Sequence, residues 1–509
     1  MNEEVKEVKR LKRVFATVYF VQGMSHLPDL SIFYYMMNVL QLGPVAGQFF
    51  QGLNKLAWFM KPVWGFISDR FRLFGYRRKS YFLIMAILAF ISWMGIALCS
   101  YLDIKWAVPY FILINIAQFA YAFVDVVVDA LMVERGQVLK KVGSFVNYQW
   151  TFIGVALVII SIFGGWFQTK VEKGEFQYWV IFACTAIFPF LTAIVGSLNF
   201  EEEHVPGSFS WKNSWSSMKT GSLGLIKGIP RVPRRIADFV KREKLIFLLV
   251  LFIFFWNFSP SVGYVSRTFL VKERGFTPMV FGVLKLFASV TWILSLLFYR
   301  WMTKRFRSIT WDQYLYAMIA LGAVSLVLGY YFYLPPDHPL SWTIPFDWSR
   351  VLNTLSPIKD TPVLNWVYQI AEGASTWNRY HWWALLVDNT LSFATMPAFI
   401  IPLTLAGEAT SKENAGMMYA LLMSVSNFTN AIEDVAGGVL YQFFSFSWMK
   451  GFMTFFENSF LNIAVSHDET VLILQIFVYI SAFFTVIAIP FIYMVKKGFE
   501  ERGIQVHLN

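Results

Sequence analysis

Three acidic residues lie close together at the end of one apolar run. Asp125 and Asp129 are four residues apart, so on a helix they share a face. Glu134 lies on the side opposite Asp125 at about 100° per residue. A carboxylate inside a membrane-spanning helix is costly and is by default a functional candidate. We expect Asp125 to face a cavity or a proton path; a structural ion pair is the alternative.

Three lysines also lie inside apolar runs. They are Lys55, Lys61 and Lys285. Buried cations suit the carboxylates of an anionic solute, and Lys61 is the strongest candidate for this role. Its alternative is an ion pair with Asp125 or Asp129. Lys55 and Lys285 could instead extend their charged ends toward the membrane surface.

Other polar residues interrupt the runs that would line a central cavity. Asp29 lies in the first run, Asn257 in the seventh and Asp388 in the tenth, and Pro260 is placed to break the seventh helix. Polar groups inside spans face the bundle interior or a watery cavity. We expect five residues to bind the solute or couple its movement to protons: Asp29, Lys61, Asp125, Asn257 and Asp388.

The loop after the second run carries a glycine, an aspartate and paired arginines. Gly65 would permit close helix approach, and Asp69 can accept charge-assisted hydrogen bonds. We expect Asp129 and Glu134 to pair with an arginine from this loop or with Arg135. These residues predict a latch for one conformation; simple retention of basic residues in the cytoplasm is the alternative. The predicted latch comprises Gly65, Asp69, Arg77, Arg78, Asp129 and Glu134.

Long apolar segments must position these side chains. Of the 509 residues, 57% are hydrophobic and 15% charged, whereas soluble proteins carry about 25% charged residues. A membrane span needs roughly 20 apolar residues. The sequence predicts twelve spans, at 14–39, 45–68, 81–102, 107–133, 145–167, 178–198, 245–270, 279–302, 314–334, 383–406, 415–443 and 471–495.

The spans divide into two sets of six. We expect an N-terminal six-helix bundle at 1–200, a cytoplasmic linker at 201–244 and a C-terminal bundle at 245–509 with a Trp-rich outer insertion at about 335–382. Lys and Arg gather in the segments that are cytoplasmic if both termini lie inside. The net charge of +11 therefore reflects topology and not nucleic-acid binding. The two cysteines lie in apolar runs and predict neither a disulfide framework nor a metal site.

The fold class predicted is an all-α polytopic membrane protein, and its layout resembles the major facilitator superfamily. Four further patches resemble the folate–biopterin transporter family. They have the sequences YFVQG at 19–23, KPVWGFISD at 61–69 with LFGYRRKSY at 73–81, DVVVDALMVER at 125–135 and YALLMSVSNF at 419–428. Lys61 lies within the second patch. The patches extend over nearly the whole chain in order.

The resemblance implies proton-coupled symport of folates or pterins, with no cofactor, by a monomer in membrane lipid. The family also includes carriers of S-adenosylmethionine, and this chain departs from it near Asp29 and in the long loop before the tenth span. The same fold carrying another solute is therefore an alternative, as is a receptor that uses the outer loop. No P-loop, zinc-protease or serine-hydrolase motif is present, so an enzyme is not expected. No transit peptide is evident, which favours a bacterial inner membrane.

Overall fold

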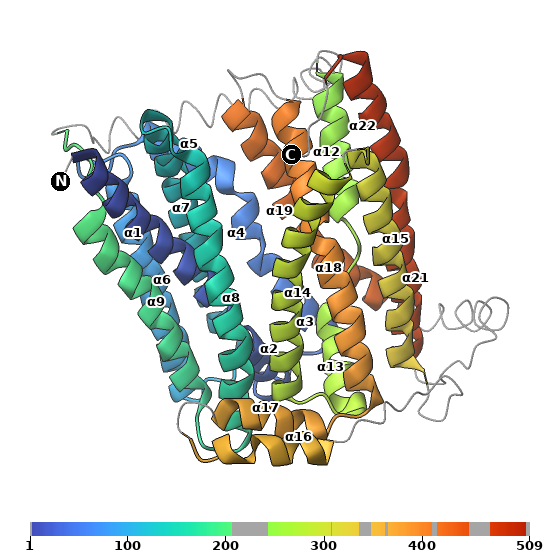
Figure 1. Cartoon of the computed structure of the whole chain (residues 1–509). Helices are drawn as coiled ribbons and strands as arrows, with labels where there is room; N and C mark the ends of the chain where they lie inside the picture. The colour runs from blue at the N-terminus through green and yellow to red at the C-terminus, as the bar shows by residue number, and fades with distance from the viewer. Residues whose placement is uncertain are drawn as a thin grey trace.

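The computed structural model is a bundle of α-helices, most of them nearly parallel (Figure 1). It describes residues 3–205, 243–306, 308–334, 348–361, 365–409, 415–446 and 469–504. No strand occurs among these residues. The predicted all-α class is therefore confirmed. Most of the predicted linker (206–242) and the first part of the outer insertion (335–347) lie outside the described residues.

The N-terminal half supplies the helices up to residue 199. They are α1 (Glu3–Met24), α2 (Asp29–Asn38), α3 (Pro44–Asn54), α4 (Leu56–Phe59), α5 (Lys61–Arg70), α6 (Lys79–Tyr101), α7 (Ala107–Val138), α8 (Val142–Glu172) and α9 (Tyr178–Asn199).

The C-terminal half supplies the helices from residue 244 onward. They are α12 (Lys244–Asn257), α13 (Gly263–Arg274), α14 (Pro278–Arg305), α15 (Trp311–Gly329), η2 (Tyr330–Tyr333), α16 (Trp348–Leu355), η3 (Ser356–Ile358), α17 (Asn365–Ser375), α18 (Arg379–Glu408), α19 (Ala415–Phe444), α21 (Glu469–Ile487) and α22 (Ile489–Glu501).

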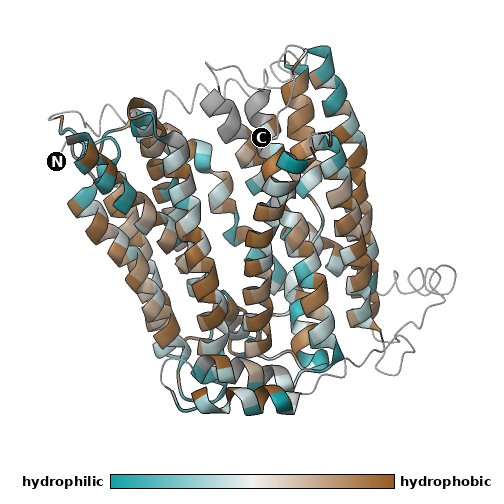
Figure 2. Ribbon diagram, in the orientation of Figure 1, coloured by the Kyte–Doolittle hydropathy of each residue, from teal (hydrophilic) through white to brown (hydrophobic). Residues whose placement is uncertain are grey.

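The long helices are apolar on every side. On α6, Trp93 and Ile96 are buried against the bundle, while Ile87, Ile91 and Leu98 are exposed. A helix that is apolar all round requires an apolar surrounding, which a bilayer supplies. Figure 2 shows hydrophobic residues along the middle of the long helices and hydrophilic residues toward their ends. Eight helices of the described chain are long and apolar enough to span a membrane.

Four of the predicted spans are broken into shorter α-helices; in one of them, 471–495, Ala488 alone separates α21 from α22. The run 14–39 forms α1 and α2, separated by a turn that ends at Pro28, and the run 45–68 forms α3, α4 and α5. The run 245–270 forms α12 and α13, separated by non-helical residues that include Pro260. Proline lacks the N–H that continues a helix, which accounts for this last break. The count of twelve spans remains a prediction.

The two halves meet along two seams. One seam joins α8 to α14, and the other joins α19 to α3, α4 and α5. At the first seam, a Cβ added to Gly165 would lie 2.7 Å from the carbonyl oxygen of Pro278 and 3.0 Å from Cα of Gly282. Beside the second seam, but within the C-terminal half, a Cβ on Gly437 of α19 would collide with the backbone of Ser261. Glycine at these positions lets the backbones approach closely.

The two ends of the bundle differ. The start of α1 and the end of α22 lie at the same end, and α16 and α17 lie across the opposite end (Figure 1). At that opposite end the halves contact each other: Tyr34 donates to the carbonyl oxygen of Phe276 at 3.4 Å, and Tyr264 donates to that of Leu42 at 3.1 Å. The structure is therefore sealed between the halves at the end that carries α16 and α17.

Candidate functional site

Charged residues from both halves approach each other beside the turn that separates α1 from α2. Nδ1 of His26 lies 3.0 Å from Oδ2 of Asp29, the first residue of α2. The Asp29 carboxylate is within electrostatic range of Arg267 on α13 and Lys285 on α14. Asp29 belongs to the N-terminal half and both cations belong to the C-terminal half, so this group spans the space between the halves.

Arg267 is held by aromatic rings. Its guanidinium carbon lies 5.2 Å from the ring centre of Phe33 and 5.8 Å from that of Phe281, distances typical of cation–π contacts. Its charge also acts on Asp388 of α18. Thus the predicted residues Asp29 and Asp388 lie near one guanidinium. Arg267 is absent from the predicted set, although an arginine within the predicted span 245–270 is itself a signal.

Lys285 lines a cavity between the halves. The cavity has a volume of about 320 Å³. Its walls come from α8, α14 and α18 and are formed by Gly154, Leu157, Lys285, Ala288, Ser289, Trp292, Ile293, Ser392 and Thr395. One aromatic ring and three hydroxyl groups beside an ammonium suit a solute that is partly flat and partly polar.

Lys61 and Asp125 form a separate pair within the N-terminal half. Lys61 Nζ lies 2.6 Å from Oδ2 of Asp125, and the side chain of Asp125 is only 4% exposed. The Lys61 ammonium also lies 4.9 Å from the ring centre of Trp58. The ion pair that the sequence left as an alternative for both residues is therefore present.

The pairing predicted for Asp129 is wrong. Oδ1 of Asp129 accepts a hydrogen bond from the hydroxyl of Tyr19 at 2.5 Å, not a bond from an arginine of the loop or from Arg135. One turn of α7 separates Asp129 from Asp125, so the Lys61 ammonium acts on both carboxylates. The carboxylates of Asp125 and Asp129 therefore both lie near the Lys61 ammonium, and the Tyr19 hydroxyl is hydrogen-bonded to Asp129.

The other predicted latch charges do meet. Arg78 Nη2 lies 2.7 Å from Oε1 of Glu134 and 3.1 Å from Oδ1 of Asp69. Arg77 Nη2 lies 2.7 Å from the same oxygen of Asp69. Arg78 is buried, with 5% of its side chain exposed. These contacts join the loop after α5 to the end of α7.

The reason predicted for Gly65 is wrong. A Cβ at this position would lie 3.6 Å from Cγ1 of Val126, an ordinary van der Waals distance. Close approach of α5 to α7 therefore does not require glycine there.

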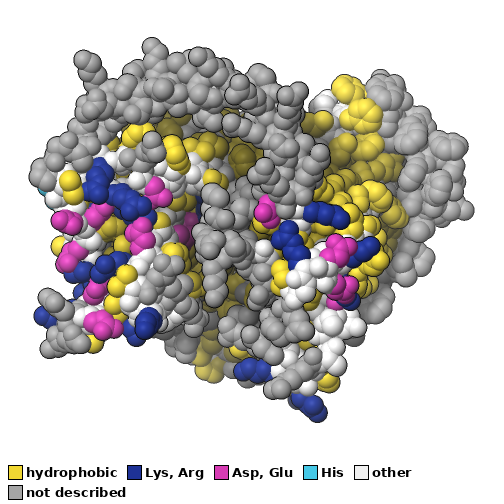
Figure 3. Space-filling view, turned by 90° about the horizontal axis from the view of Figure 1, so that it is seen from above, with side chains coloured by type: hydrophobic (Ala, Val, Ile, Leu, Met, Phe, Trp, Pro, Cys, Tyr) yellow, Lys and Arg dark blue, Asp and Glu magenta, His cyan; other side chains and the backbone are white. Residues whose placement is uncertain are grey.

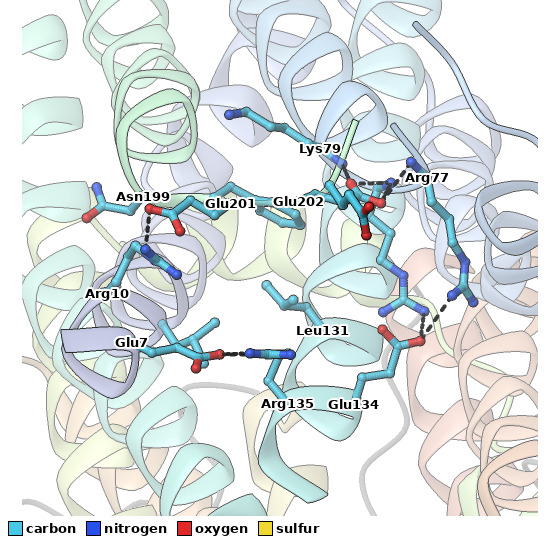
Figure 4. A pocket seen from close by; sticks show the side chains of 14 residues that line it. Glu7, Arg10, Arg77, Lys79, Leu131, Glu134, Arg135, Asn199, Glu201 and Glu202 are labelled. Atoms are coloured by element: carbon cyan, nitrogen blue, oxygen red, sulfur yellow. Dashed lines mark hydrogen bonds and ion pairs between the residues drawn. The ribbon is translucent and has the colours of Figure 1, made fainter. Parts of the chain in front are cut away.

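Residues of this loop line a cavity of about 590 Å³ whose walls carry many charged side chains (Figure 4). Glu202, which the sequence did not single out, accepts backbone hydrogen bonds at 2.8–2.9 Å from Arg77, Arg78 and Lys79. Lys79 begins α6, so the carboxylate lies at a helix N-terminus, where its charge is favourable. Seen from above, acidic and basic side chains gather over this half (Figure 3). The start of the predicted linker is thereby bound to the predicted latch.

A second charged group ties the halves together near the middle of the bundle. Lys55 Nζ lies 2.7 Å from Oδ2 of Asp434 and 3.0 Å from Oε1 of Glu433. Gln48 is fully buried; it donates to Oδ1 of Asp434 at 2.8 Å and accepts from the backbone N–H of Tyr264 at 3.0 Å. The acidic pair on α19 therefore binds a lysine of the other half.

Asn257 is the least distinctive of the predicted site residues. It is the last residue of α12, and its side-chain amide donates to the carbonyl oxygen of Ile253, one turn earlier, at 2.7 Å. This bond stabilises the helix end before the break. It uses only one of the two amide hydrogens.

Comparisons with known proteins identify related sequences. A model of the BT1 family matches residues 22–365. The folate-biopterin transporter of Synechocystis sp. is 26% identical over 467 residues, which cover 90% of this chain and 78% of that protein. Folate transporter 1 of Plasmodium falciparum is 22% identical over 434 residues, covering 83% and 71%.

Similar folds occur among solved transporters of the major facilitator type. The POT family transporter PepTSo superposes with a TM-score of 0.61 at 13% identity, covering 97% of this chain and 98% of that one. A D-xylose-proton symporter superposes with a TM-score of 0.58 at 13% identity, covering 96% and 98%. At this identity the similarity concerns the fold alone.

Proposed function

Since the chain belongs to the BT1 family, whose folate–biopterin transporters are multi-pass membrane proteins and not enzymes, we propose that it carries a folate- or pterin-like solute by proton-coupled symport. The site for that solute lies between the halves, among Asp29, Arg267, Lys285 and Asp388. The observation that carries this assignment is the meeting of charged residues from both halves around one space. A solute held there touches both halves, so its binding depends on their relative position.

The distribution of contacts supports a mechanism of alternating access. The halves are sealed at the end that carries α16 and α17, which we assign to the outside. In the transport cycle that seal opens while contacts form at the other end. The latch around Arg78 and Glu134 stabilises one of the two states. Rocking of the halves about the α8–α14 and α3–α19 seams converts one state into the other.

Proton coupling is assigned to the Lys61–Asp125–Asp129 group. Two carboxylates share one ammonium, so one extra proton balances the charge without an added cation. Ionisable groups buried in spans commonly form proton relays. Asp125 is the carboxylate that loads and releases the proton in our proposal.

The topology proposed for the whole chain has twelve spans, cytoplasmic termini, and halves at 1–200 and 245–509 joined by the linker 201–244. It places a monomer in the inner membrane of a bacterium. The structure agrees on one point: α1 starts and α22 ends at the same end of the bundle.

The test is uptake of radiolabelled folate or biopterin into proteoliposomes with an imposed pH gradient. Asn at position 125 mimics a carboxyl that is always protonated. We expect Asp125→Asn to lower gradient-driven uptake at least about tenfold, because the proton cannot be released. Exchange of labelled for unlabelled solute should persist, since exchange does not require that release.

Asp103→Asn is the matched control, because the side chain of Asp103 is 71% exposed just after α6 and its one ion pair among the described residues is with Lys105. Its uptake should equal that of the wild type. Gradient-driven uptake that survives in Asp125→Asn would remove Asp125 from the coupling mechanism. Absence of wild-type uptake for both solutes, with S-adenosylmethionine transported instead, would replace the proposed solute.

A further inference from the structure

The cations inside the predicted spans fall into two classes. Lys55 and Lys61 each have a carboxylate oxygen within 2.7 Å. For Arg267 and Lys285, no carboxylate oxygen of the described residues lies within the 4.0 Å limit of an ion pair. Unpaired charge in a membrane interior is expensive and indicates a functional role. Arg267 and Lys285 therefore lack the partner that the other two cations have.

The surroundings of each of these two cations leave its charged end able to bind a solute. The aromatic faces of Phe33 and Phe281 flank the guanidinium of Arg267, which makes no hydrogen bond to another described residue. A planar guanidinium held in this way can present two N–H groups to a carboxylate. The side chain of Lys285 is exposed to the cavity of about 320 Å³ between α8, α14 and α18.

The neighbouring carboxylates do not neutralise the pair directly. Asp29 is bonded to His26. Asp388 makes no direct ion pair with Arg267 and interacts with it only electrostatically, over a longer distance. The site thus offers two cations, from α13 and α14, whose charges act on each other and on the same carboxylate, Asp29. A solute with an anionic end and a hydrogen-bond-donating end would match both parts.

We propose that Arg267 and Lys285 form an anion-docking pair that holds the carboxylate end of the solute, so that the preferred substrate is an acidic folate and not a neutral pterin. This inference rests on the proposed function and specifies its substrate class. The glutamyl end of a folate carries two carboxylates, one for each cation. The pterin ring, which donates hydrogen bonds from its amino edge, is then left to the side of Asp388.

The test compares folate, which has the acidic end, with biopterin, which lacks it. In proteoliposomes, Arg267→Gln and Lys285→Gln should each raise the KM for folate about tenfold or more and leave the KM for biopterin within about twofold. Arg267→Lys should recover part of the loss, because it restores the charge without the planar fork. Biopterin uptake also reports whether each variant is folded.

Lys272→Gln is the matched control. Lys272 lies on α13 like Arg267, but it is exposed in the last turn. It should leave both KM values unchanged. A parallel loss of folate and biopterin uptake in Arg267→Gln and Lys285→Gln, or no change in either, would overturn the inference while leaving the proposed function in place.

A competition experiment needs no variant. We expect p-aminobenzoylglutamate, which carries the acidic end without the pterin ring, to inhibit folate uptake by the wild-type protein, and its bis-amide to lack this effect. Equal inhibition by both compounds, or by neither, would overturn the anion-docking pair. A wild-type protein that transports neither folate nor biopterin would overturn the proposed function itself, and the inference with it.

Discussion

At the scale of single residues, the Lys61–Asp125 pair joins two helices of the N-terminal half. Lys61 begins α5 and Asp125 lies on α7, and their charged atoms are 2.6 Å apart. Removal of one partner from a buried pair leaves an uncompensated charge, whereas removal of both partners costs much less. The pair can therefore be tested for stability independently of transport.

We expect Lys61→Met to lower the free energy of unfolding by about 3–5 kcal/mol, because Asp125 loses its counter-ion. The double variant Lys61→Met with Asp125→Leu should regain most of that loss yet remain unable to use a pH gradient. Thermal unfolding in detergent measures the first effect, and uptake measures the second. Equal stability of the single and double variants would contradict the proposed ion-pair energetics.

The positions of unusual charged residues were more predictable from the sequence than the partners of those residues. Asp125, Asp129 and Lys61 stand out in the sequence because charges are rare in apolar runs. Their partners depend on how α1, α5 and α7 pack, so the bond between Asp129 and Tyr19 has no local signal. Glu202 was missed for a similar reason: its three backbone donors form a helix N-terminus that exists only in the fold.

At the scale of helices, the close contact between α8 and α14 depends on small residues. Gly165 faces the backbone at Pro278 and Gly282, whereas a Cβ on Gly154 of the same helix would meet nothing within 4 Å. Helix packing in membranes is driven by such close approach. The two glycines therefore form a matched pair for testing the seam.

Gly165→Leu should separate α8 from α14 at the sealed end, whereas Gly154→Leu should not. We expect the distance between spin labels at positions 105 and 272, both exposed, to increase by several ångströms in Gly165→Leu alone, since a leucine side chain must be accommodated. Pulsed electron spin resonance measures the distance. The native cysteines Cys99 and Cys184 are replaced beforehand. An unchanged distance would contradict the prediction and show that the leucine is accommodated by small shifts near position 165.

The positions of the long helices could be predicted from the lengths of the apolar runs. The breaks within those runs could be predicted only in part. Pro260 predicts the break between α12 and α13. Within the run 45–68, Pro62 in the first turn of α5 is a comparable signal for the break before α5, whereas the break between α3 and α4 at Lys55 has none. The backbone there follows the contacts that Lys55 makes with α19, which belong to the tertiary structure.

At the scale of the whole molecule, Lys55 links the halves near the middle of the bundle. It binds Glu433 and Asp434, while Gln48 joins Asp434 to the backbone of Tyr264. These bonds stabilise the state in which the end that carries α16 and α17 is sealed. In the proposed transport cycle, some of them must break before that end opens.

We therefore expect Lys55→Gln to shift the population toward a state that is open at the end carrying α16 and α17, because the buried Asp434 and the half-buried Glu433 lose their cation. A shift of about 1–3 kcal/mol corresponds to roughly 5–150-fold in the conformational equilibrium. Access of a membrane-impermeant thiol reagent to a cysteine at position 276 would report it, because Phe276 is buried and contributes its backbone carbonyl, not its side chain, to the bond with Tyr34; Lys105→Gln is the exposed control. Unchanged access would mean that the bridge is not part of the seal.

The long apolar helices were predictable because each span is a local property of the sequence, and the family was predictable because the resemblance extended over most of the chain. The direction in which the halves are sealed was not predictable. It depends on contacts such as Tyr34 with Phe276, which are 242 residues apart in the chain. Conformational state is decided by the sum of such long-range contacts, and no short motif encodes that sum.

The contact between Gly437 and Ser261 has a consequence for how this protein can vary. The N–H of Ser261 donates to the carbonyl oxygen of Glu433 at 3.0 Å, so α19 and the break before α13 share a hydrogen bond next to the glycine. Even an alanine methyl would have to displace that shared backbone. In a saturation library selected for uptake, position 437 should tolerate glycine alone, while the neighbouring lipid-facing position 439 should accept most apolar residues.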